Sequence, residues 1–200
     1  MKRLFLSAPV IAVISAFLPL QAQAASDWII DLQPGVVFIN ANANAFSIEN
    51  ASLKESMSMV SSMPNIGFGI SVEQPEGYFD FKVGTGVLLN SRLSSMFYFA
   101  SVGYSYEVRP SILFGPHFSY SSYAAPSWWG DGEIEFSGTS GMDLGVHLIM
   151  GDKIAYAFSL DYANCVFDVD GTSNGWTVSK NEDQLDMSGI VISFGFRTRF

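Results

Sequence analysis

Two residues in one short stretch of the chain could form a catalytic pair. His117 and Ser119 are separated by a single residue, and Asp131 and Glu133 follow in the next polar segment. A histidine can take the proton of a serine hydroxyl while a carboxylate orients the imidazole, so these side chains are capable of attacking an ester. The local alternation places both on the face opposite Phe118, which is the polar face of a strand. We therefore expect them to fill a polar interior and predict no enzymatic site.

Residues that could bind metals are sparse. Segment 168–175, Asp-Val-Asp-Gly-Thr-Ser-Asn-Gly, carries closely spaced oxygen atoms that could hold calcium, but it lacks the spacing and the distal glutamate of an EF-hand loop. The two histidines, His117 and His147, are far apart in the sequence, and Cys165 is the only cysteine. Neither a zinc site nor a disulfide framework is indicated. We predict a solvated acidic loop at 168–175 and no cofactor.

The charge balance and the first residues indicate where the protein resides. The chain carries 10 Lys and Arg against 19 Asp and Glu, which disfavours nucleic acid as a partner. Residues 1–24 begin with the basic pair Lys2 and Arg3, continue in an apolar run and end in Gln-Ala-Gln-Ala. This is the pattern of a secretory signal peptide cleaved after Ala24. The sequence therefore predicts an exported, acidic mature chain of residues 25–200 that forms one domain.

The mature chain alternates between apolar and polar residues. After residue 24 no apolar run approaches the roughly 20 residues of a membrane-spanning helix, yet the mean hydropathy of the chain is +0.25. Segments with a period of two residues, typical of β-strands, recur along it. There are eight of them, at 27–38, 65–73, 79–90, 98–107, 112–121, 141–148, 155–163 and 189–200. The chain is therefore predicted to be all-β.

The less apolar face of these segments separates two all-β folds. The solvent face of a soluble sandwich would be rich in Lys, Glu and Thr. Here that face is mostly Gly, Ser and Ala with a few charges, which suits the narrow interior of a small barrel. A closed barrel also pairs every backbone group within a bilayer. We predict a closed antiparallel eight-stranded transmembrane β-barrel, with a periplasmic sandwich as the alternative.

The inner face carries charges of both signs. Because buried charges persist when they are paired, we predict a salt-bridge network in the lumen. Its expected members are Asp31, Asp80, Glu107, Asp143 and Asp161 with Lys82, Arg197 and Arg199; Glu73 and Arg109 share the same face. The first and last strands of a closed barrel must meet. Arg197 and Arg199 are therefore expected to pair with Asp27 and Asp31.

The connections between segments alternate in length. Those at 74–77, 108–110 and 151–153 are short, and the longest lie around 40–63, 122–138 and 166–185. Short periplasmic turns and long external loops are the arrangement of outer-membrane barrels. Pro34 and Pro116 predict a bulge or a locally broken strand because proline has no N–H to donate. Trp128 and Trp129 fall in an external loop and are candidates for surface contact.

In these respects the chain resembles the small eight-stranded outer-membrane barrels of Gram-negative bacteria, the OmpX type and the barrel half of the OmpA type. The most specific motif is the terminal Phe-Gly-Phe-Arg-Thr-Arg-Phe, residues 194–200. It is similar to the C-terminal signal read by the barrel-assembly machinery, with Phe196 and Phe200 among its aromatic residues. The resemblance implies location in the cell outer membrane, contact with its lipid and lipopolysaccharide, and a role in envelope integrity, surface adhesion or resistance.

Three functions stay open at this point. The main expectation is a structural or adhesin-like role, in which external loops touch a surface or host partner. A narrow porin-like channel is the first alternative, although the inward Phe99 and Leu113 favour a filled interior. The second is a lipid A-modifying hydrolase that uses His117 and Ser119. Outer-membrane lipid A deacylases follow their His-x-Ser pair with Asn-Ala, where this chain has Tyr-Ser, and they need the pair to face lipid.

Overall fold

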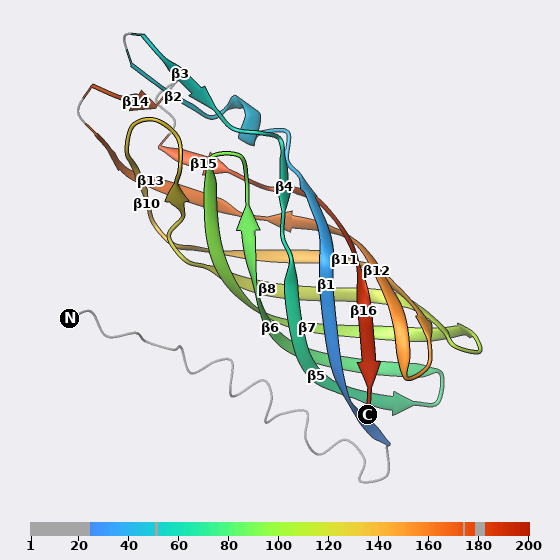
Figure 1. Cartoon of the computed structure of the whole chain (residues 1–200). Helices are drawn as coiled ribbons and strands as arrows, with labels where there is room; N and C mark the ends of the chain where they lie inside the picture. Colours follow the sequence, from blue (N-terminus) through green and yellow to red (C-terminus); the bar gives the residue numbers. More distant parts are fainter. Residues whose placement is uncertain (1–24, 51, 174, 179–182) are drawn as a thin grey trace, which may run out of the picture.

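A computed structural model describes residues 25–200 except 51, 174 and 179–182. The predicted signal peptide, residues 1–24, lies outside the described residues. Eight long antiparallel strands form one closed sheet, shown in Figure 1. They are β1 (Ser26–Ile39), β5 (Asn65–Gln74), β6 (Gly77–Leu89), β7 (Leu93–Arg109), β8 (Ile112–Tyr123), β11 (Thr139–Gly151), β12 (Ile154–Asn164) and β16 (Gly189–Arg199).

The sheet closes through its first strand. β1 pairs with β5 on one side and with β16, the last strand, on the other. The register places Asp31 opposite Arg197 in the β1–β16 pair. The closed antiparallel eight-stranded barrel predicted from the alternation is therefore confirmed, and each of the eight predicted segments forms one of its strands.

The three connections predicted to be short are tight turns at one end of the barrel, the end at which the chain terminates (Figure 1). The β7–β8 turn needs a left-handed residue, Ser111, at a φ of 64°. The neighbouring β11–β12 turn begins at Gly151 with a φ of 127°, a conformation that L side chains rarely adopt. The Gly151 N–H donates to the Ser111 carbonyl at 2.8 Å, and the Ser111 hydroxyl donates to Asp152. These bonds hold the two turns side by side.

The outer surface of the barrel is apolar. β12 and β16 are each 11 residues long, and a tilted strand needs about 9–11 residues to cross a bilayer. Outward aromatic side chains cluster near both ends of the strands, as in the girdles of membrane barrels. They include Trp28, Tyr106, Tyr156, Phe196 and Phe200 toward the turns, and Tyr98, Tyr120 and Tyr162 toward the long connections. Among the described residues, no helix is long and apolar enough to cross a membrane.

The long connections are folded, which the sequence did not predict. β2 (Ser47–Glu49), β3 (Lys54–Ser56) and β14 (Thr177–Val178) form one small sheet. β10 (Ile134–Phe136), β13 (Val166–Thr172) and β15 (Gln184–Asp186) form another. β4 (Val60–Ser62) and β9 (Ser127–Trp128) extend the barrel wall, and η1 (Ala43–Ala45) is a single turn. We call the described residues of 40–59, 124–138 and 165–188 the headpiece.

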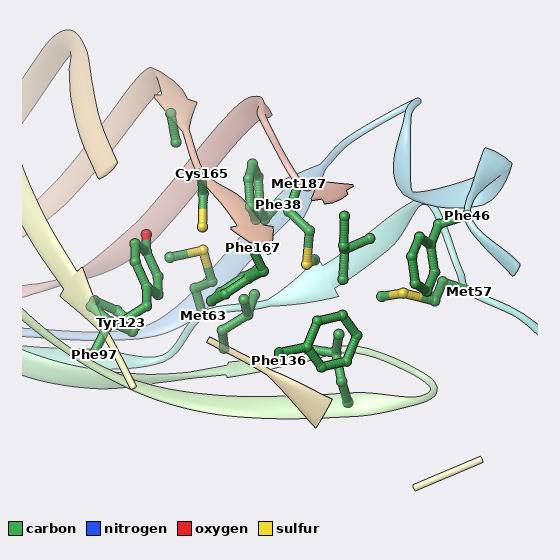
Figure 2. Packing of buried hydrophobic residues seen from close by; sticks show 14 of the residues in the cluster. Phe38, Phe46, Met57, Met63, Phe97, Tyr123, Phe136, Cys165, Phe167 and Met187 are labelled. Atoms are coloured by element: carbon green, nitrogen blue, oxygen red, sulfur yellow. The ribbon is translucent and has the colours of Figure 1, made fainter. Parts of the chain in front are cut away.

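The headpiece and the adjoining strand ends share an apolar core, shown in Figure 2. Fully buried side chains from each long connection meet there. They include Phe46, Ile48 and Met57 from the first, Ile134 and Phe136 from the second, and Cys165, Phe167, Leu185 and Met187 from the third. The prediction that these segments are loops was wrong, because apolar runs of two or three residues are too short to show a strand period. Only their meeting above the barrel buries them.

The two prolines behave differently. The register between β1 and β16 shifts between Leu32 and Gly35, so the bulge predicted at Pro34 is confirmed. Pro116 causes no shift, since the β8–β11 ladder runs through its pair with Val146. The β7–β8 ladder instead lacks the pairs between Gly103–His117 and Tyr106–Phe114. The missing N–H of Pro116 therefore falls on the β7 side, where pairing is locally interrupted.

Candidate functional site

The barrel interior is layered from the turns to the headpiece. Near the turns it is apolar, with Leu113, Ile149 and Ala155 packed beside Tyr78. An ion cluster and a group of histidine, aspartate and serine side chains follow. Together they line a cavity of about 80 Å³, large enough for a few water molecules. Phe97 and Phe99 line the same cavity toward the headpiece. The functional candidates are thus the polar interior and the headpiece.

Arg197 is the centre of the ion cluster and is only 2% exposed. Its Nε and Nη2 donate to the two carboxylate oxygens of Asp31 at 2.6 and 2.8 Å, and its Nη1 donates to Asp80 at 2.5 Å. Lys82 Nζ also contacts Asp31, at 2.6 Å, and the Ser71 hydroxyl donates to Asp80 at 2.7 Å. Two carboxylates, from β1 and β6, therefore face two cations, from β6 and β16. Four of the residues expected in the lumen network thus lie in one ion cluster, which joins the first and last strands.

Other predicted members of the network lie elsewhere. Arg199 sits opposite Ile29 and stacks on the ring of Tyr78, with its guanidinium carbon 4.4 Å from the ring centroid. None of the ion pairs between described residues joins Arg199 to Asp27 or Asp31, so the predicted pairing of Arg199 with an acid of the first strand is wrong. Glu107 is exposed, and none of the ion pairs between described residues includes it. Glu73 and Arg109 are exposed in the same way. All of these residues lie at strand ends, where the inner face meets solvent.

Asp143 and Asp161 do line the interior, but in a second group that contains neither Lys82 nor Arg197. Asp161 Oδ1 lies 2.6 Å from His117 Nε2, although the N–H does not point at it, and Asp161 Oδ2 accepts a hydrogen bond from Ser159 at 2.7 Å. Asp143 accepts only a long bond of 3.5 Å from a serine, and its Oδ1 is buried without a hydrogen-bond partner. These two carboxylates are thus matched by histidine and serine rather than by a permanent cation.

The two histidines meet inside the barrel. Their ring planes are 22° from parallel and their centroids are 5.2 Å apart, and the Nδ1 atoms of His117 and His147 are 3.2 Å apart, so the rings meet edge to edge. His147 Nε2 lies 2.6 Å from the hydroxyl of the fully buried Ser105. The sequence analysis treated the histidines separately because they are far apart in the chain. Both histidines alternate onto the inward face, and their strands are neighbours. These two facts together could have predicted that they meet.

The proposed catalytic residues are not assembled. Ser119 lines the same cavity as His117, but the ring nitrogens of His117 face Asp161 and His147. Asp131 and Glu133 lie exposed on the headpiece. The structure thus separates the carboxylates from the pair that they would have to orient.

The loop residues singled out in the sequence are distributed over the headpiece. Trp128 is half-buried and packs against Phe46 and Phe136, with centroids 6.5 and 6.4 Å apart, so only part of it is available for surface contact. Trp129 is 56% exposed. In the acidic loop, Asp168 accepts a hydrogen bond from Gln184 and Asp170 accepts from Ser137. No group of three or more His, Cys, Asp or Glu side chains suited to a metal occurs in the part of the chain described here.

Phe196 and Phe200, the aromatic residues of the predicted assembly signal, point outward from the last strand. Phe196 lies against Tyr156, with ring centroids 5.5 Å apart. The backbones of Phe200 and Trp28 exchange two hydrogen bonds of 3.0 and 3.1 Å. The terminal residue is therefore part of the closed wall, with its side chain on the lipid face.

Asp186 connects two headpiece segments, and its contacts predict that the stability of the headpiece depends on pH. Partial burial alone would raise the pKa of Asp186, but hydrogen bonds from Ser188 and from Asn42 outweigh it and hold the pKa below its ordinary value of 3.8. A carboxyl with a lowered folded-state pKa stabilises the fold above its unfolded value and loses that contribution as the pH falls through the folded value. Headpiece stability is thus expected to fall below pH 3.8.

The measurement is protease cleavage of the headpiece in lipid vesicles as a function of pH, with an acid-stable protease. Asp186→Asn should flatten the part of the profile that lies below pH 3.8. Asp183→Asn, an exposed neighbour, is the matched control and should leave the profile unchanged. Equal profiles for wild type and Asp186→Asn would contradict the assignment.

Comparison with known proteins identifies the fold. No protein-family model matches the sequence, and no curated protein sequence does either. The structure is similar to the outer membrane protein OprG from Pseudomonas aeruginosa, with a TM-score of 0.52 and 11% identity over 88% of this chain and 97% of that one. It is also similar to Neisserial surface protein A, with a TM-score of 0.48 and 10% identity over 88% of this chain and 99% of that one.

The similarity to OprG shows a shared fold, the eight-stranded outer-membrane barrel, as predicted. With the apolar outer surface, this fold agrees with the predicted outer-membrane location.

Proposed function

We propose that the barrel anchors the headpiece in the outer membrane and that the headpiece makes contact with a positively charged surface outside the cell. The observation that carries this proposal is the apolar core of the headpiece (Figure 2). Connections that only joined strands would not need a common core such as the one in which Phe46, Phe136 and Phe167 are buried together. A shared core fixes the shape of the external surface, and a fixed surface favours specific contact because less conformational entropy is lost on binding.

The charge of the headpiece supports a cationic partner. Exposed carboxylates dominate it: Glu49, Asp131, Glu133, Glu135, Asp168, Asp170 and Asp183. Arg92, beside the headpiece, forms an ion pair of 2.7 Å with Glu55, which leaves Lys54 as the unpaired cation among the described residues of this region. Complementary charge accelerates association and suppresses partners of like charge.

The test compares beads of opposite charge. Cells that display the protein are mixed with amine-coated and with carboxylate-coated beads at low and at high salt. We expect preferential attachment to amine-coated beads that weakens with salt, and a loss of this preference in a variant with Asp131→Asn, Glu133→Gln and Glu135→Gln. Glu73→Gln and Glu107→Gln, exposed at the opposite end of the barrel, form the matched control. Attachment that is independent of bead charge, or unaffected by the headpiece variant, would argue against the proposal.

A channel is the competing function, and the layering of the interior speaks against it. A permeating ion would have to pass the Arg197 ion cluster and the apolar layer that contains Phe97. Single-channel recording in planar bilayers is therefore expected to show no discrete conductance steps. Regular steps from the wild-type protein would favour the channel.

A hydrolase finds no support in the placement of His117 and Ser119. The acylation of lipid A is therefore expected to be the same in a Ser119→Ala strain as in the wild type.

A further inference from the structure

We propose that His117 and His147 form one proton-binding site inside the barrel. The pair takes up one proton while a hydrogen stays shared between the two rings, and the uptake of a second proton breaks their contact. This acid-sensitive device is independent of the headpiece and of what it binds. The observation behind it is the distance of 3.2 Å between the two Nδ1 atoms. An imidazole nitrogen donates when it carries a hydrogen and accepts when it does not. The contact therefore needs one hydrogen between the two atoms, neither none nor two.

The neutral pair satisfies this requirement in one arrangement. His147 carries its hydrogen on Nδ1 and donates it to His117 Nδ1, while His147 Nε2 accepts from the Ser105 hydroxyl at 2.6 Å. The hydrogen of His117 is then on Nε2, beside the Asp161 carboxylate at 2.6 Å. Three of the four ring nitrogens thus have a hydrogen-bond partner of the required kind, and the fourth, His117 Nε2, lies beside a carboxylate without a hydrogen bond to it.

One added proton keeps the contact. It binds His147 Nε2, and the Ser105 hydroxyl, which can donate or accept, turns to accept from it. The hydrogen between the two Nδ1 atoms stays where it is and belongs to either ring, so the charge is shared by His117 and His147. Hydrogens then occupy His147 Nε2, the shared position and His117 Nε2. The charge lies next to Asp161, which has no Lys or Arg partner among the described residues.

A second proton has no place in this arrangement. Its only remaining site is a Nδ1 atom, which would set two N–H groups against each other and put two positive rings 5.2 Å apart. The groups that face the pair are Asp161, Asp143, Asp31 and Asp80 with Lys82 and Arg197, and the ion cluster already pairs its two carboxylates with its two cations. The rings must therefore separate, into the cavity of about 80 Å³ that they both line.

The experiment uses the two histidines as the only probes, because the chain contains no others. The untagged full-length mature protein is labelled with ¹⁵N-histidine, refolded in lipid nanodiscs and titrated from neutral to acidic pH by NMR. We expect uptake of one proton by the pair with a ¹⁵N–¹⁵N coupling across the shared hydrogen, followed at lower pH by a second uptake at which the coupling disappears. Two independent titrations without coupling, or a coupling that survives full protonation of both rings, would overturn the proposal.

Variants separate the shared proton from simple burial. Ser105→Ala removes a hydrogen bond that His147 Nε2 makes in both states. Because the bond made by the charged ring is the stronger one, the first uptake should move to lower pH. Ser119→Ala changes a serine of the same cavity wall that has no such contact with either ring, and should leave both steps in place. Because the wild-type spectra alone decide the outcome, a folding defect in a variant does not rescue the proposal. Equal effects of the two serine changes would contradict the role of Ser105.

Discussion

Arg197→Met is expected to lower the free energy of unfolding of the barrel by about 3–5 kcal/mol, the cost of breaking a buried ion pair by removing one partner. Methionine fills similar space but leaves the buried Asp31 and Asp80 with Lys82 as the one cation beside them among the described residues. It also removes three hydrogen bonds, two that join the last strand to β1 and one that joins it to β6. The measurement is urea unfolding of the refolded protein in lipid vesicles, followed by tryptophan fluorescence and by the gel shift between folded and unfolded forms.

Two control variants are compared with Arg197→Met for their loss of unfolding free energy. Lys82→Met removes one contact to Asp31 and leaves Arg197 in place, so a smaller loss of about 1–3 kcal/mol is expected, as for a buried group that loses one partner. Arg109→Met removes an exposed cation at the turn end and should change stability by less than about 0.5 kcal/mol. If Arg197→Met were no more destabilising than Arg109→Met, the ion cluster would not stabilise the closed barrel.

The ion cluster was predictable because it follows from parity and closure. Alternation fixes which side chains point inward, and a closed sheet must bring the first strand to the last, so inward acids of the first strand were expected to meet Arg197 and Arg199. The register of the two strands, which the sequence does not give, makes the pair Asp31 and Arg197. The same reasoning failed for Arg199 and Glu107, because parity says which face a residue is on but not where the enclosed interior ends. That boundary depends on the tilt and stagger of the strands.

The headpiece lay beyond prediction for a different physical reason. Its strands are two to seven residues long, and their apolar side chains meet only after three connections converge above the barrel. A period of two cannot be read from segments such as 134–136, and the acidic residues between them resemble an ordinary solvated loop. Trp128 shows the consequence, since its burial depends on Phe46, more than eighty positions earlier in the chain. Non-local packing of this kind leaves little trace in one sequence.

Phe167→Ala is expected to unfold the headpiece while the barrel stays closed. Phe167 is fully buried and its ring contacts Tyr123 and Phe136, with centroids 5.9 and 6.5 Å apart. Truncating a buried phenylalanine to alanine costs about 3–5 kcal/mol. Here the loss falls on a unit whose strands are only two to seven residues long. The eight long strands keep their own ladders, since Phe167 belongs to β13, which pairs with β10 and β15.

The measurement is limited proteolysis of intact proteoliposomes together with the heat-dependent gel shift. Phe167→Ala should be cleaved in the segments 40–59, 124–138 or 165–188 under conditions that leave the wild type intact, while the fragment that spans the membrane still migrates as a folded barrel. Trp129→Ala is the matched control, because it removes an exposed aromatic side chain of the same unit. Resistance equal to that of the wild type would mean that the apolar core does not hold the connections together. Loss of the folded barrel band would mean that headpiece and barrel fold as one cooperative unit, so that the headpiece could not be exchanged without the membrane anchor.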